Sequence, residues 1–249
     1  MRCKAVGATL LLVGTLVVTT GASAGVAGAA SSGTAESPAG LVKAALAAAD
    51  AQSSVHWVSK GKVGGASIVI TTQAGQSDGY QTYVISEQSA SAELAEADVG
   101  QTCFVNGDAV GLEAVLNFKS TPAAAEAGKW LSDKPGGPEY QEIAAGLTLS
   151  TTMAPLEMQG TVKALPGKTI AGHRVLAVRG NSEPFEGNPS VPETLYVAAT
   201  GKMLPVEAVQ EESKQLTVTI DFSRWGSPVQ VQAPSGAVAI QKSWITSSK

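Results

Sequence analysis

The feature that most constrains the fold is a strict alternation of side chains near the C-terminus. From residue 216 to residue 222, a large apolar side chain at every even position alternates with threonine or aspartate at every odd position. Successive side chains of a strand point to opposite faces of its sheet. This segment is therefore predicted to be a strand with one buried face.

Other segments rich in β-branched and aromatic residues predict further strands on both sides of a central region. Short turns separate several of them, including residues 75–79 and Thr200-Gly201-Lys202. Because short turns join neighbouring antiparallel strands, the sheet is predicted to be antiparallel. The predicted strands are residues 55–63, 66–72, 80–86, 92–98, 101–106, 129–131, 161–165, 173–181, 194–199, 204–211, 215–222 and 229–233.

Helical patterns lie before the strands and in the middle of the chain. Residues 41–50 are rich in alanine and follow Ser37 and Pro38, either of which can begin a helix. Asp108 is a candidate cap for a helix over residues 108–117. Further helices are predicted over residues 121–127, 139–145 and 150–157. Helices grouped between two sets of strands imply a single α+β domain, residues 41–235, whose helices cover one face of the sheet.

The N-terminus has the pattern of a secretory signal peptide. Arg2 and Lys4 precede an apolar run over residues 6–18, and Ala22-Ser23-Ala24 supplies small residues for cleavage. Cleavage is expected after Ala24, or as late as residue 30. A retained N-terminal anchor is the alternative, although the run is short for a hydrocarbon core of about 30 Å.

The segments outside the domain are expected to be unstructured or removed. Residues 25–40 form a small, polar leader, and residues 236–249 are expected to be a C-terminal tail. A lipidated bacterial protein carries a cysteine directly after the apolar run, whereas Cys3 lies before it. Lipid anchoring is therefore not expected, and the location predicted is secreted or periplasmic.

Charge and cysteine content exclude several classes of protein. Lys and Arg total 17 and Asp and Glu total 21, for a net charge of −4. Nucleic-acid binding is not expected, because such proteins use an excess of basic side chains on phosphates. After cleavage at residue 24 only Cys103 remains, so no intramolecular disulfide is possible; its apolar neighbours predict a buried strand position.

The residues offer little for catalysis or metal binding. The G-x-S-x-G sequence at residues 75–79 matches the nucleophile elbow of hydrolases, and His173 and Asp133 could serve as its base and acid. The elbow requires a helix after the serine, whereas a strand is predicted there. A hairpin loop is the simpler interpretation. His56 and His173 have no metal-ligand spacing, and the carboxylates are scattered along the sequence. No catalytic residue, metal or cofactor is predicted, and the chain is not expected to be an enzyme.

Four short segments, in order, resemble a known family. They are residues 103–108 (CFVNGD), 125–130 (AEAGKW), 195–205 (LYVAATGKMLP) and 221–226 (DFSRWG), the last followed by Pro228-Val229 and Ala233-Pro234. Together they are similar to the LppX/LprG-type envelope lipoproteins of actinobacteria, which have the half-barrel fold of the LolA and LolB lipoprotein carriers.

This resemblance implies a curved antiparallel sheet with helices over its concave face and an apolar cavity for acyl chains. It implies no catalytic residues. The function expected is that of a non-enzymatic carrier or binding protein for lipids in the bacterial cell envelope. Its partners would be a lipid or acylated molecule and a membrane transporter or envelope protein, and a monomer is expected.

Large apolar side chains on the predicted helices and strands are the candidates for lining such a cavity. The same residues could simply pack as a core. A rival function is therefore a scaffold or sensor domain without a cavity, which binds a protein partner through an exposed apolar patch. The third alternative is the esterase at Ser77. The candidate lining residues are Leu112, Val115, Leu116, Met153, Leu156, Val197, Val218 and Ile220.

Overall fold

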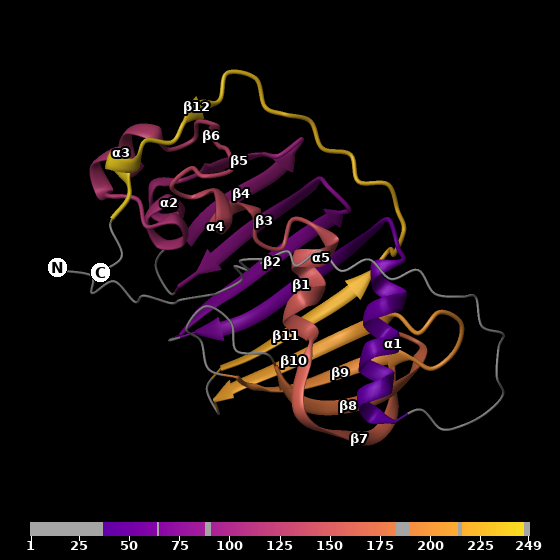
Figure 1. Cartoon of the computed structure of the whole chain (residues 1–249). Helices are drawn as coiled ribbons and strands as arrows, with labels where there is room; N and C mark the ends of the chain where they lie inside the picture. Colours follow the sequence, from indigo (N-terminus) through magenta and orange to yellow (C-terminus); the bar gives the residue numbers. More distant parts are fainter. Residues whose placement is uncertain (1–36, 64, 88–90, 183–189, 214–215, 247–249) are drawn as a thin grey trace.

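The architecture comes from a computed structural model of the whole chain (Figure 1). The structure describes residues 37–246 apart from residues 64, 88–90, 183–189 and 214–215. The predicted signal peptide and residues 25–36 of the predicted leader lie outside the described residues.

One twelve-stranded, curved and unclosed sheet organises the molecule, as the sequence predicts for an α+β half-barrel. Neighbouring strands are antiparallel, except that the C-terminal β12 pairs in parallel with β6. The order across the sheet is β12-β6-β5-β4-β3-β2-β1-β11-β10-β9-β8-β7. The strands are β1 (Ser54–Val63), β2 (Ala66–Gly75), β3 (Gly79–Ser86), β4 (Ser91–Val99), β5 (Thr102–Gly107), β6 (Leu131–Asp133), β7 (Met158–Ile170), β8 (His173–Ser182), β9 (Pro192–Ala198), β10 (Pro205–Ser213), β11 (Leu216–Ser223) and β12 (Val238–Ala239).

The pairing of β1 with β11 joins the early strands to the late ones. Trp57 of β1 lies opposite Phe222 of β11, and both side chains are buried. The predicted alternation over residues 216–222 is thus part of a strand that pairs on both sides, with β1 and β10. The strand predicted at residues 161–165 is longer than expected, and the one predicted at residues 129–131 begins at Leu131.

The helices lie on one side of the sheet (Figure 1). Side chains cap three of them: Ser37 accepts a hydrogen bond at the start of α1, Asp108 at the start of α2, and Thr148 in a reciprocal capping box at the start of α5. The first two caps were predicted from the sequence. The helices are α1 (Pro38–Asp50), α2 (Ala109–Leu116), α3 (Ser120–Glu126), α4 (Tyr140–Ala144) and α5 (Leu149–Met153), with the 3₁₀ turns η1 (Ala154–Leu156) and η2 (Lys242–Trp244).

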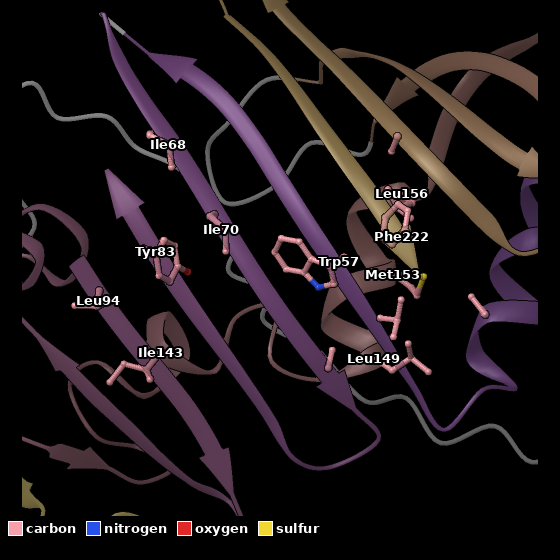
Figure 2. Close-up of a cluster of buried hydrophobic side chains, with 14 of the residues drawn as sticks. Trp57, Ile68, Ile70, Tyr83, Leu94, Ile143, Leu149, Met153, Leu156 and Phe222 are labelled. Carbon is pink, nitrogen blue, oxygen red and sulfur yellow. The ribbon is translucent and has the colours of Figure 1, made fainter. Parts of the chain in front are cut away.

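The core lies between these helices and the concave face of the sheet. On β2, buried residues occupy every second position from Ala66 to Ala74. Figure 2 shows Trp57, Ile70 and Tyr83 projecting from three neighbouring strands into the buried cluster. Side chains from α5 and η1 complete the same cluster. The one-sided burial predicted from alternation therefore extends across the central strands.

The strand predicted at residues 229–233 is wrong. Within the described residues this segment has no strand pairing, although its side chains alternate. Gln230, Val231, Gln232 and Pro234 instead line a cavity of about 260 Å³ together with residues of the convex face. The strands beneath it, β2 to β4, are already paired on both sides. An alternating segment that meets no free strand edge has no partner for its backbone.

The residues predicted as a C-terminal tail contact the domain over most of their length. Val238 of β12 lies opposite Leu131 of β6. The Trp244 ring packs against Phe118, with 6.1 Å between ring centroids. The amide of Thr246 donates a hydrogen bond of 2.9 Å to the carbonyl of Asn117. The C-terminal segment therefore crosses the convex face, and its last described residues lie beside α2 and α3.

Candidate binding face: the concave side of the sheet

The structure gathers most of the predicted lining residues into the buried cluster on the concave face. Leu112, Leu116, Met153, Leu156 and Val197 are buried members of this cluster, and Val115 and Ile220 are partly buried and pack against it; Val218 is half-buried and faces Gly61 of β1. In the structure these side chains pack as a core, so their role as cavity lining stays a prediction.

One row of side chains crosses the concave face through five directly paired residues. Phe222 lies opposite Trp57, Trp57 opposite Thr72, and Thr72 opposite Gln81. Gln81 in turn lies opposite Glu96 of β4. The row from Trp57 to Glu96, which we call the polar row, therefore places hydrogen-bonding groups side by side within an otherwise apolar surface.

Hydrogen bonds connect three members of the polar row to their surroundings. The Thr72 hydroxyl donates to Gln81 Oε1 at 3.1 Å, and Gln81 Nε2 donates to Glu96 Oε2 at 2.5 Å. Gln81 Nε2 also lies 2.9 Å from the hydroxyl of Tyr83 and 3.0 Å from the carbonyl oxygen of Ala145. The amide of Gln81 thus links the sheet to the residue that follows α4.

Two atoms of the polar row differ from the rest. Among the described residues, neither Trp57 Nε1 nor Glu96 Oε1 has a hydrogen-bond partner, and both are buried. Burial is the largest cause that raises the pKa of Glu96, to about 8, and the nearby Glu142 raises it further. Glu96 is therefore mostly neutral at pH 7, because desolvation penalises the charged carboxylate.

Further carboxylates gather beside this row, which the sequence did not predict. The carboxylate of Asp133 accepts a hydrogen bond of 2.8 Å from the backbone amide of Glu139. Burial, together with Glu142 and Asp133, raises the pKa of Glu139 to about 8. Among the described residues, no group of three or more histidine, cysteine or acidic side chains is arranged to hold a metal ion. Like Glu96, Glu139 is therefore mostly neutral at pH 7, because burial penalises its charged form.

A sequence signal for the polar row exists, but it is incomplete. Gln81 and Tyr83 alternate with Tyr80 and Thr82, so neither face of β3 is clearly apolar. Likewise, Glu96 follows Leu94 on the buried face of β4. Only the register of the strands shows that the polar residues are neighbours.

Ser77 does not lie in a nucleophile elbow. It is exposed in the hairpin between β2 and β3, and the following element is a strand. This agrees with the hairpin loop predicted for residues 75–79. His173, the candidate base for Ser77, begins β8, and five strands separate β8 from β3 in the sheet. Cys103, as predicted, is fully buried in β5, and burial raises the pKa of its thiol.

Comparisons with known proteins identify the fold. No protein-family model and no curated protein matches the chain. Among solved structures, LprF from Mycobacterium bovis matches with a TM-score of 0.55 and 15% identity, covering 80% of this chain and 97% of that one. The lipoprotein LppX from Mycobacterium tuberculosis matches with a TM-score of 0.49 and 15% identity, covering 80% of this chain and all of that one.

These likenesses concern the backbone, at an identity too low to carry over residue roles. In the described part of the chain, no helix has both the length and the apolar character needed to cross a membrane. The chain has the fold of LprF, and this fold agrees with the half-barrel that its sequence resemblance predicted: a curved antiparallel sheet with helices over its concave face.

Proposed function

We propose that this protein is a non-enzymatic binding protein for lipid acyl chains, held between the concave face of its sheet and helices α4 and α5. The observation that carries the proposal is the continuous apolar cluster on this face, in a fold shared with LprF. Burying a methylene group contributes about 0.8 kcal/mol, so a dozen of them outweigh any single polar contact.

The cover over this face suits a binding site that opens. α4 and α5 have five residues each, and η1 has three. Gly146 joins α4 to α5 with a φ of +71°, a conformation that favours glycine. Because the side chains beneath this cover pack against one another, an acyl chain enters as residues 140–156 move away from the sheet. Because only the open form binds lipid, the apparent affinity equals the affinity of the open form multiplied by the fraction of protein that is open.

Native mass spectrometry of the purified protein tests this proposal. The protein is expected to carry lipid from its host or to take up added dioleoylglycerol as a discrete mass increase. Met153→Trp enlarges a side chain in the cluster and is expected to reduce uptake. Val110→Trp, at a position of α2 that is 53% exposed, is the matched control and should retain uptake. A folded protein that never binds lipid contradicts the proposal.

The rival function is a scaffold domain that binds a protein partner. The observation in its favour is that the interior is filled by the protein's own side chains. Against it, the exposed large apolar residues are spread over several elements: Val84, Val110, Leu165, Leu176 and Val238 lie on β3, α2, β7, β8 and β12. A protein-binding surface would gather such residues into one patch.

The remaining features of this proposal follow from the sequence. We propose that the signal peptide directs the domain of residues 41–235, with its C-terminal segment, to the periplasm or outside the cell without a lipid anchor. The protein would act as a monomer that receives or delivers lipid at a membrane transporter or another envelope protein. Comparing the mass of the secreted protein with that of the full chain tests the cleavage site.

A further inference from the structure

We infer that the polar row from Trp57 to Glu96 recognises the ester carbonyl of an acyl lipid. This inference rests on the proposed function, because it specifies which chemical group of the lipid the concave face selects. An acyl chain alone would need only an apolar surface. The polar row lies instead where the proposed path of the chain crosses β1, β2, β3 and β4.

The first observation is the indole of Trp57. Its side chain is 2% exposed, and no described residue accepts a hydrogen bond from its Nε1. An indole N–H is a donor only, and tryptophan usually finds a partner when it is buried. Leaving such a donor unpaired is unfavourable, because its desolvation is not offset by a hydrogen bond. A ligand with an acceptor would recover this free energy on binding.

The second observation is the direction of the hydrogen bonds at Glu96. Gln81 Nε2 donates to Oε2, so this oxygen acts as the acceptor of the carboxyl group. In the neutral acid the proton is then on Oε1, the oxygen without a described partner. The hydroxyl of Tyr83 also hydrogen-bonds to this carboxyl group, and Glu142 and the thiol of Cys103 are near enough to interact with it electrostatically.

The polar row therefore presents two unused donors, the indole N–H and the acid O–H. The other hydrogen-bonding side chains of the row, Thr72 and Gln81, already pair with neighbours. A carboxylic ester matches this arrangement, since its carbonyl oxygen has lone pairs and no hydrogen to donate. A free fatty acid matches less well, because burial penalises its charged carboxylate and because Glu142, whose charge raises the pKa of Glu96, lies nearby.

A comparison of ester and ether lipids tests this inference with the full chain. The two probes are dioleoylglycerol and the dialkyl ether of glycerol with the same chains, which lacks both carbonyls. Dissociation constants are measured by native mass spectrometry from a non-ionic detergent. At pH 7 the wild-type protein is expected to prefer the ester about tenfold, which corresponds to the loss of one hydrogen bond to the ligand.

Two variants measure how much each donor, the indole N–H of Trp57 and the acid O–H of Glu96, contributes to the preference for the ester. Trp57→Phe keeps an aromatic ring but removes the N–H, and the preference should fall several-fold. Glu96→Gln keeps a neutral donor that does not ionise. The wild-type preference should decline above pH 8, whereas that of Glu96→Gln should persist at pH 9. Trp225→Phe is the control, because the indole of Trp225 donates to the carbonyl of Pro205, outside the row.

The outcomes separate this inference from the proposed function. Binding of neither lipid overturns the proposed function and this inference with it. Equal binding of ester and ether by the wild-type protein overturns the inference alone. So does an unchanged preference in Trp57→Phe, with folding confirmed by circular dichroism. If Trp57→Phe does not fold, the pH dependence of wild type and Glu96→Gln still decides the question.

Discussion

The two faces of the sheet use the same strands in opposite ways. On the concave face, Trp57, Ile70 and Leu94 are almost completely buried under the helices. On the convex face, the same strands and their neighbours hold exposed ion pairs, such as Lys60 with Asp221 at 3.4 Å. In the described part of the chain, the C-terminal segment around Val231 covers part of the convex face.

This difference shows where the stability of the fold resides. Burial of apolar surface contributes about 25 cal/mol per Å², whereas exposed ion pairs contribute about 0–1 kcal/mol each. The concave face therefore supplies most of the stability. It is also the face that must open if a lipid is to bind, so binding and stability compete for the same side chains.

The largest expected effect comes from two adjacent residues of β2. Ile70 is 1% exposed on the concave face, and Val69 is half-buried on the convex face. Ile70→Ala should lower the free energy of unfolding by about 2–5 kcal/mol, because it removes packed methyl groups and leaves a cavity. Val69→Ala should lower it by less than about 1 kcal/mol. Urea denaturation measures both, and equal losses would contradict the contrast between the faces.

The next effect is a pH dependence that arises on the concave face. The folded-state pKa of Glu96 is raised from 4.5 to about 8, so between these values the folded state binds more protons than the unfolded state. Stability should then fall as pH rises from about 4.5 to 8, by up to about 1.4 kcal/mol per pH unit for this group.

Thermal melting at pH 5, 6, 7 and 8 measures this slope. Glu96→Gln should reduce the slope, because glutamine does not titrate, but Glu139, whose pKa is also raised to about 8, should keep part of it. Glu207→Gln is the control on the convex face, where Glu207 pairs with Lys168 at 3.1 Å, and should leave the slope unchanged. If the wild-type protein becomes more stable from pH 5 to pH 8, the buried acids do not dominate the pH dependence of its stability.

A smaller effect is expected where the C-terminal segment returns to the helices. Trp244 is half-buried and packs against Phe118 at a tilt of 49°. Trp244→Ala should cost about 1–2 kcal/mol, from lost apolar burial and the aromatic contact. Limited proteolysis should also show faster cleavage after residue 234. If neither changes, this segment does not contribute to the stability of the domain.

The smallest effect is expected on the exposed ion pair of the convex face. The side chains of Lys60 and Asp221 are 60% and 44% exposed. Lys60→Ala should change the free energy of unfolding by less than about 0.5 kcal/mol, since solvent screens the pair. The double variant with Asp221→Ala completes the cycle. A coupling energy above about 1 kcal/mol would mean that the convex face contributes more than the contrast assumes.

The sequence predicted most of the elements for identifiable reasons. Alternation over residues 216–222 and turn residues at 75–79 are local signals, as are the caps Ser37 and Asp108. Each depends on side chains within a few positions of one another. The strand predicted at residues 229–233 is wrong because of a non-local condition. An alternating segment forms a strand only when another strand offers it a free edge.

The amino-acid sequence by itself determined most of the strands, their buried sides and most helix starts, because these depend on local periodicity, and its resemblance to a known family indicated the half-barrel. Only the tertiary structure decided the polar row, the acidic group around Glu139 and the path of the C-terminal segment. Trp57 and Glu96 lie in one row across the sheet, with Thr72 and Gln81 between them, because four strands pair in one register. Register depends on contacts between residues that are distant in sequence, so no local pattern contains it.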